Sequence, residues 1–143
     1  MNPKYKAVIC DLDGTLQQVT EREKYIHSHE WDKFHAASVN EEPNLWCLEI
    51  VNRLKSDHEI FFLTGRKDSY REITEDWLLV KCDLSPNEYQ LYMTPDETIA
   101  LPFKKKIYLE NIKPEYDVLF AIDDDDHICF MFKSLGITCL QVK

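Results

Sequence analysis

The chain has 143 residues, which is long enough to bury a hydrophobic core and is a usual size for one domain. Hydrophobic residues make up 44% of it, as in a soluble globular protein, and the formal net charge is −9 at pH 7. Proteins that coat nucleic acid bind by neutralising phosphates, so this charge argues against that class and leaves only local nucleic-acid contacts. We therefore expect residues 1–143 to form a single domain.

Several common features are missing from the sequence. The five cysteines include no Cys-x-x-Cys pair, and an odd number without metal-binding spacing is typical of reduced thiols in a cytosolic protein. We find no apolar stretch of membrane-spanning length and no signal-peptide core, so we predict a cytoplasmic protein without membrane contact. The three glycines do not form a Walker or Rossmann phosphate loop, and we expect no dinucleotide cofactor.

Apolar runs alternate with amphipathic segments along the chain. We predict strands at about 5–10, 59–63, 89–93, 118–122 and 137–142, and helices at about 43–55, 69–80, 103–112 and 127–135. Between them, residues 17–43 predict a loop with room for a short helix, too small for an independent cap, and residues 94–102 predict a proline-bearing loop. Strands that alternate with helices predict a Rossmann-like three-layer α/β/α sandwich around a mostly parallel five-stranded sheet.

The first apolar run ends in two carboxylates two residues apart, Asp11 and Asp13, followed by Gly14. At the carboxyl end of a parallel strand, such a pair enters the crevice where α/β sheets bind ligands. Carboxylates this close repel each other unless a cation lies between them or one is protonated. A calcium loop is the alternative, but the residues after Thr15 lack the further ligands of an EF-hand. The pair therefore favours a catalytic site.

Three further polar segments accompany the later strands and helices. Residues 64–66, Thr-Gly-Arg, follow the second strand directly, which favours function over a simple turn. Residues 104–106 are three lysines, a pattern that is usually the solvated start of a helix. Residues 123–126 are four aspartates, which cannot all be ligands, and Asp125 and Asp126 are candidates to cap the next helix.

In this order, the motifs Asp-x-Asp-Gly-Thr, Thr-Gly-Arg, Lys and Asp-Asp resemble those of the haloacid dehalogenase-like (HAD) phosphohydrolases over nearly the whole chain. A narrower resemblance, to the 3′-phosphatase domain of bacteriophage polynucleotide kinase, rests on Arg22, on residues 62–66, on Lys104 with Ile107, on residues 121–124 and on residues 135–142. The resemblance implies a HAD-like fold with a minimal cap or none. The sequence departs from it at Ala100, where the resembled domain carries an Asp.

The resemblance also implies a role for each matched residue. Asp11 would attack phosphorus as the nucleophile, and Asp13 would protonate the leaving group and then activate water. Mg²⁺ would be held by oxygen ligands, namely Asp11, the main-chain carbonyl of Asp13, and Asp123 or Asp124. The resemblance implies that Thr64, Gly65 and Lys104 bind the phosphoryl oxygens of the substrate. It also implies that Arg22 and Arg66 bind the remainder of the substrate.

The implied reaction is Mg²⁺-dependent hydrolysis of a terminal phosphate, and the implied substrate is the 3′-phosphate of a polynucleotide or nucleotide. Arg22, Arg66, Lys67 and Lys104 are candidates for a local positive funnel toward it. A 5′-nucleotidase acting on deoxynucleoside monophosphates is the enzymatic alternative. A non-catalytic phospho-acceptor domain is another, although the third strand ends without the aspartate that such domains phosphorylate. The sequence leaves open whether a partner chain delivers the substrate.

Aromatic residues and histidines gather in residues 17–43. We expect Tyr25, Trp31 and Phe34 to pack in the core or against the cap, with stacking on a nucleic-acid base as the alternative. The three histidines of this segment lack the companion ligands of a transition-metal site, so we expect surface or packing roles for them.

Overall fold

The structure is a computed structural model that describes residues 4–143. Its strands are β1 (Tyr5–Cys10), β2 (Glu59–Lys67), β3 (Gln90–Thr94), β4 (Tyr116–Asp123) and β5 (Cys139–Gln141). Its α-helices are α1 (Glu23–His27), α2 (Trp31–Ala36), α3 (Leu45–Leu54), α4 (Arg71–Cys82), α5 (Ala100–Ile107) and α6 (Asp126–Ser134), and a π-helical turn, Tyr108–Ile112, continues α5. Short 3₁₀ segments are η1 (Thr20–Arg22), η2 (Ala37–Asn40), η3 (Asp68–Tyr70) and η4 (Pro86–Glu88).

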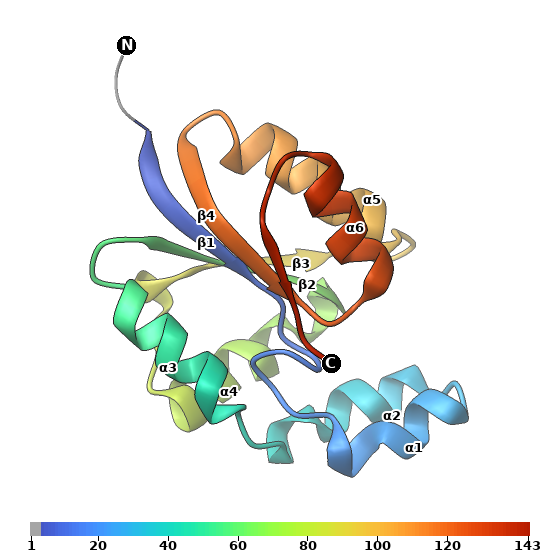
Figure 1. Cartoon of the computed structure of the whole chain (residues 1–143). Helices are drawn as coiled ribbons and strands as arrows, with labels where there is room; N and C mark the ends of the chain where they lie inside the picture. Colours follow the sequence, from blue (N-terminus) through green and yellow to red (C-terminus); the bar gives the residue numbers. More distant parts are fainter. Residues whose placement is uncertain (1–3) are drawn as a thin grey trace.

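The five strands form one parallel sheet in the order β3-β2-β1-β4-β5, with helices on both faces (Figure 1). Successive side chains of a strand point to opposite faces, and β1 shows the consequence. Val8 and Cys10 pack in the cluster with α3 and α4, whereas Ala7 and Ile9 pack in the cluster with α6 and the π-helical turn. The predicted α/β/α sandwich is confirmed, and β1 lies at its centre.

Two element boundaries differ from the prediction. Strand β2 continues to Lys67, so the Thr-Gly-Arg triplet is the end of the strand and does not follow it. Helix α5 begins at Ala100, inside the segment predicted to be a proline-bearing loop. Pro102 is tolerated there because it stands in the first turn of the helix, where a backbone N–H has no intrahelical partner.

Residues 17–43 are more helical than predicted. They contain α1 and α2 between η1 and η2, and Figure 1 shows α1 and α2 beyond the end of the sheet rather than on either face. Phe34 is buried and gives this helical insertion a small apolar centre, with the Trp31 ring packed edge-on 5.7 Å away. The insertion is also tied to the main body, because the Trp77 indole N–H of α4 donates to the Glu41 carbonyl at 2.8 Å.

Across residues 4–143, none of the helices combines the length and the apolar character that crossing a bilayer requires. All five cysteines fall within this range and are buried free thiols. Gly136 ends α6 with a backbone φ of 85°, a left-handed conformation that favours glycine.

Candidate active site

Three carboxylates meet where β1 and β4 end. The two strands are parallel neighbours, with Cys10 opposite Ile122, so the residues that follow them emerge side by side. Asp11 comes directly after β1, Asp123 ends β4, and Asp124 comes next. One oxygen from each of the three carboxylates lies within 4.8 Å of the others. The topology therefore assembles an all-oxygen group from segments that are more than a hundred residues apart in the chain.

Lys104 of α5 lies between two of these carboxylates. Its Nζ is 3.2 Å from Asp11 Oδ1 and 2.7 Å from Asp123 Oδ2, and its side chain is almost fully buried. Burial alone would lower the pKa of Lys104, but the two adjacent carboxylates outweigh it and raise the pKa, so the ammonium stays charged. Burial, reinforced by repulsion from Asp123, raises the pKa of Asp11 well above its usual range. One ammonium among three carboxylates leaves an excess of negative charge.

Gly14 makes room for the third carboxylate. Its φ of 80° lies in the left-handed region, and a Cβ at this position would come within 2.3 Å of Asp124 Oδ2. No side chain fits at that distance without moving Asp124. The glycine after the two aspartates thus serves both the turn and the close approach of a site carboxylate.

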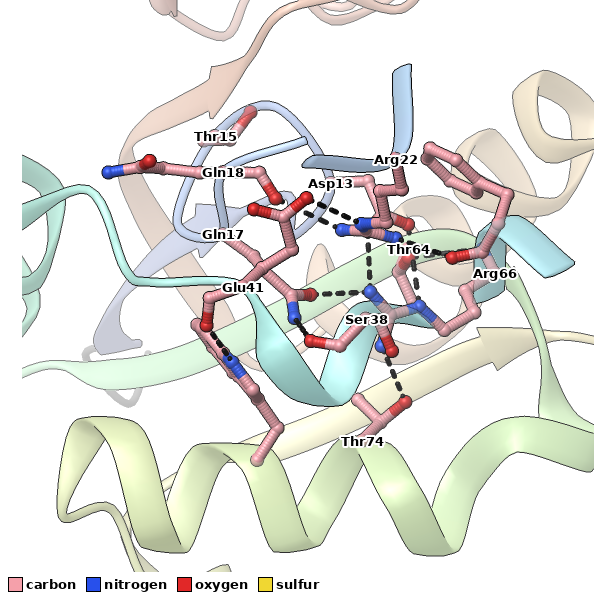
Figure 2. A network of polar contacts seen from close by, with 12 residues as sticks. Asp13, Thr15, Gln17, Gln18, Arg22, Ser38, Glu41, Thr64, Arg66 and Thr74 are labelled. Atoms are coloured by element: carbon pink, nitrogen blue, oxygen red, sulfur yellow. Dashed lines mark hydrogen bonds and ion pairs between the residues drawn. The ribbon is translucent and has the colours of Figure 1, made fainter. Parts of the chain in front are cut away.

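The Asp13 carboxylate is not part of this group of three and contacts two arginines instead (Figure 2). Arg66 makes a two-pronged contact, with Nη2 2.5 Å from Asp13 Oδ1 and Nε 3.4 Å from Oδ2, and Arg22 Nη2 is 2.6 Å from Oδ1. Burial alone would raise the pKa of Asp13, but the charges and hydrogen bonds of Arg66 and Arg22 hold it well below its usual range. The Asp13 side chain is therefore outside the carboxylate group. A main-chain contact from Asp13 to a metal stays a prediction.

The placement of the arginines changes the role that we expect for them. Arg22 is fully buried, and its Nε lies 3.4 Å from a carboxylate oxygen of the equally buried Glu41. Arg66 is also buried, and its Nη1 donates to the Thr74 hydroxyl at 2.9 Å. Gln17 accepts a further hydrogen bond from Arg66 (Figure 2). Both guanidinium groups thus hold Asp13, and a direct contact from either of them to a substrate stays a prediction.

Sequence reasoning missed Gln17, Glu41 and Thr74 as parts of this network. Gln17 and Glu41 lie in the segment predicted to be mostly loop, and Thr74 lies on the buried side of α4. No spacing rule links these residues to Arg22 or Arg66. Only a polar residue at a buried helical position, as at Thr74, could have indicated a buried partner.

The residues expected to bind phosphate lie at the same end of the sheet. Thr64 is buried, and its hydroxyl accepts a hydrogen bond from the Arg66 backbone N–H at 3.0 Å. Gly65 lines the site, and a Cβ built on it would lie 3.0 Å from the Ala100 Cβ. Ala100 is the residue that departs from the resembled pattern, so the alanine lies directly against the Gly65 backbone.

These groups open into a cleft of about 860 Å³, within the usual range for ligand-binding clefts. Its polar end contains Asp11, Asp123, Asp124 and Lys104. Aromatic and aliphatic side chains from the insertion and from the loop before α5 line much of the rest. The cleft is thus far larger than a phosphate group needs.

Comparison with known proteins identifies the family. The sequence model described as "Polynucleotide kinase PNKP phosphatase domain" matches residues 5–143. The chain belongs to this family. It is a HAD-type phosphatase domain, and its reaction class is phosphoric monoester hydrolysis. The phospho-acceptor alternative is set aside on this evidence.

Two individual relatives have names consistent with this family. The chain is 29% identical over 136 residues to a "Putative bifunctional polynucleotide kinase/RNA ligase" of Autographa californica nuclear polyhedrosis virus, covering 92% of this chain and 18% of that protein. It matches a chain in the structure of the Pnkp1/Rnl/Hen1 RNA repair complex with a TM-score of 0.80 and 30% identity, over 97% of this chain and 42% of that one. The phosphatase domain therefore spans less than half the length of either relative.

More distant structures share the fold alone. A class C acid phosphatase from Bacillus anthracis matches with a TM-score of 0.66 and 16% identity, over 89% of this chain and 54% of that one. A HAD-family enzyme from Bacteroides thetaiotaomicron, solved with magnesium and inorganic phosphate, matches with a TM-score of 0.66 and 14% identity, over 97% and 94%. Both likenesses support the HAD-like α/β architecture of this phosphatase domain.

Proposed function

We propose that this phosphatase domain removes the 3′-phosphate from polynucleotide ends, with Mg²⁺ as cofactor and a covalent aspartyl-phosphate intermediate. The observation that carries the proposal is the placement of Asp11, whose carboxylate contacts the Lys104 ammonium and lies close to two further carboxylates that line the cleft. That residues 1–143 form a single domain stays a prediction.

The residues present fit a hard divalent cation. Asp11, Asp123 and Asp124 offer only oxygen ligands, and their excess negative charge is reduced by a single ammonium. Mg²⁺ prefers such ligands, whereas zinc sites use histidine and cysteine. When bound, the ion would neutralise charge on the phosphoryl oxygens and on the carboxylates.

In the first step, an Asp11 carboxylate oxygen attacks phosphorus and the bond from phosphorus to the nucleoside 3′-oxygen breaks. Lys104 already holds Asp11 Oδ1 and Asp123 Oδ2, and its remaining N–H can donate a hydrogen bond to a phosphoryl oxygen as negative charge grows there. Gly65 lines the same cleft, Thr64 precedes it on β2, and both are proposed to bind the other phosphoryl oxygens. In the second step, water attacks the phosphorus, the Asp11–phosphate bond breaks and inorganic phosphate leaves.

Asp13 is proposed to give its proton to the departing 3′-oxygen and then to take one from the attacking water. Arg22 and Arg66 favour its ionised form in the free protein, which suits the second role. A dianionic phosphate bound beside Asp13 opposes that ionisation, because like charges disfavour each other, and so favours the protonated form that the first role needs. The arginines thus act as positioning residues for Asp13.

The choice of a polynucleotide substrate rests on relatives. The viral relative is named a polynucleotide kinase and RNA ligase, and the structural relative belongs to an RNA repair complex. A cleft much larger than a phosphate group is consistent with a substrate that carries a nucleoside. A partner chain that delivers nucleic-acid ends is compatible with these relatives and belongs to the same proposal.

A phosphate-release panel tests the proposal. The protein is incubated in Mg²⁺ with a 3′-phosphorylated oligonucleotide, the matching 5′-phosphorylated oligonucleotide, dAMP and dTMP. We expect release from the 3′-phosphate only, lost at least about a thousandfold in Asp11→Asn. Asp126→Asn is the matched control, because Asp126 is exposed in the same acidic run and lies outside the carboxylate group.

Each other result has a defined meaning. Release confined to dAMP and dTMP would replace the proposal with the 5′-nucleotidase alternative. Full activity in Asp11→Asn would remove the proposed nucleophile. Activity that is unchanged when EDTA replaces Mg²⁺ would remove the proposed cofactor.

A further inference from the structure

The cleft continues from the carboxylate group along an aromatic wall. Trp31 of α2, His35 at the end of the same helix, Tyr70 of η3 and Ile99 before α5 all line it. Trp31 and Ile99 are exposed despite their apolar character, at 48% and 73%. Exposed apolar side chains gathered in one cleft indicate a ligand with an apolar surface.

Trp31 is held rigidly although half of it is exposed. Its ring packs edge-on against the Phe34 ring at 5.7 Å and an interplanar angle of 83°. Phe34 is buried, and the Arg22 guanidinium lies over its ring, 4.3 Å from the ring centroid. Arg22 in turn contacts Asp13. A continuous series of packed side chains therefore links the exposed indole to the proposed general acid, and such preorganisation lowers the cost of binding.

The neighbouring part of the wall is also fixed. The Tyr70 hydroxyl donates to Asp32 Oδ1 at 2.5 Å, which ties the insertion to η3, the segment that follows β2. The His35 and Tyr70 rings lie 4.9 Å apart. Burial, together with the charges of Arg66 and Arg22, lowers the pKa of His35 to about 4, so its ring is neutral at pH 7. The wall thus presents uncharged aromatic rings.

Few cationic groups of the cleft are free to hold a polynucleotide beyond its terminal phosphate. The cationic side chains that line the cleft already contact protein oxygens, namely Lys104 with carboxylates, Arg66 with Asp13, and Lys67 with the carbonyls of Pro95 and Thr98. The chain as a whole carries a charge of −9. Proteins that hold single strands combine cations with aromatic stacking, and in this cleft the stacking component is the one that remains available.

We propose that Trp31 stacks on the base of the 3′-terminal nucleotide while its phosphate lies at Asp11 and Lys104. The inference rests on the proposed function, because it assumes a substrate in which a base accompanies the phosphate. Stacking on an indole requires only a flat π-face, so the site accepts all four bases. The helical insertion then serves as a base platform rather than as a cap.

The test compares two 3′-phosphorylated trinucleotides that differ only in whether the terminal residue carries thymine or is abasic. For the parent we expect kcat/KM to be about 5- to 150-fold higher with thymine, the range for stacking one base on an aromatic ring. In Trp31→Ala the ratio falls to near one, and Trp31→Phe retains an intermediate ratio. Trp46→Ala keeps the parental ratio, because Trp46 is equally exposed, at 47%, but lies on α3 outside the cleft.

A binding measurement separates this inference from the proposed function. In an Asp11→Asn, Trp46→Phe variant, Trp31 is the exposed indole, because Trp77 is buried. We expect the thymine trinucleotide to quench its fluorescence and the abasic one to leave it unchanged. Selective quenching without phosphate release by any active form would refute the proposed function and retain the base platform.

Two results would overturn the inference while leaving the proposed function intact. One is turnover of 3′-phosphates with a parental ratio near one. The other is a Trp31→Ala protein that keeps the parental ratio. Should Trp31→Ala fail to fold, as judged by circular dichroism, Trp31→Phe and the quenching measurement decide the question.

Discussion

The buried pair of Arg22 and Glu41 offers the sharpest test of the network around Asp13. Replacing Arg22 with methionine keeps the side-chain volume but leaves Glu41 charged, buried and without its partner at 3.4 Å. Breaking a buried ion pair from one side costs about 3–5 kcal/mol. With an unfolding entropy of about 2.1 cal/mol/K per residue over 143 residues, this corresponds to a fall in Tm of roughly 10–17 °C.

A double-mutant cycle identifies the cause of that loss. Glu41→Gln alone should cost about 1–2 kcal/mol, because Arg22 keeps its contacts with Asp13 and with the Phe34 carbonyl. The double variant should cost no more than Arg22→Met alone, since the unpaired carboxylate is then gone. Thermal and urea unfolding without divalent cations measure all four proteins. Arg53→Met is the control, because its partner Glu49 is exposed and such pairs contribute about 0–1 kcal/mol.

The expected coupling is refuted if the costs of Arg22→Met and Glu41→Gln simply add in the double variant. Additivity would mean that the two side chains are not energetically coupled, and Arg22 would then stabilise the domain through its contacts with Asp13 and Phe34. A loss in Arg53→Met as large as that in Arg22→Met would contradict the reasoning as well, because burial would then not distinguish the two pairs.

Three further predictions concern the site and the helices beside it. Mg²⁺ at a hundred times its Kd should raise the free energy of unfolding of the parent by about 2.7 kcal/mol, as measured by calorimetry. The same Mg²⁺ concentration should stabilise Asp124→Asn by less, and equal stabilisation of the two proteins would place the ion elsewhere. Asp125 caps α6 by accepting from the N–H groups of His127 and Ile128, so Asp125→Ala should lose about 1 kcal/mol in urea unfolding, and an unchanged midpoint would deny the cap. His35 stays neutral in the folded protein down to its pKa of about 4, whereas in the unfolded chain it takes up a proton below about pH 6.5. As the pH falls through this range, the free energy of unfolding of the parent should therefore decrease by about 1–2 kcal/mol relative to that of His35→Phe. Parallel stability curves for these two proteins would exclude that contribution.

The order of elements could be predicted because it depends on short-range pattern. Apolar runs and helical spacing located all five strands, and the strand-to-helix alternation predicted the parallel sheet. The Asp-x-Asp-Gly motif was placed correctly at the end of β1, since a buried strand must end where charged side chains begin. The start of α5 was missed because a proline in the first turn looks, in sequence, like a loop.

The arrangement of the site depends on contacts that no local pattern contains. Asp11, Lys104 and Asp123 could be grouped in advance only through family resemblance and the rule that parallel strands end at one edge of the sheet. The sequence by itself determined which segments are strands, which are helices, and where acidic residues follow them. Only the tertiary structure decided that Asp13 faces Arg22 and Arg66, that Glu41 is buried beside Arg22, and that Trp31 lines the cleft. The physical reason is that a side chain's partner and exposure depend on which distant segments pack against it.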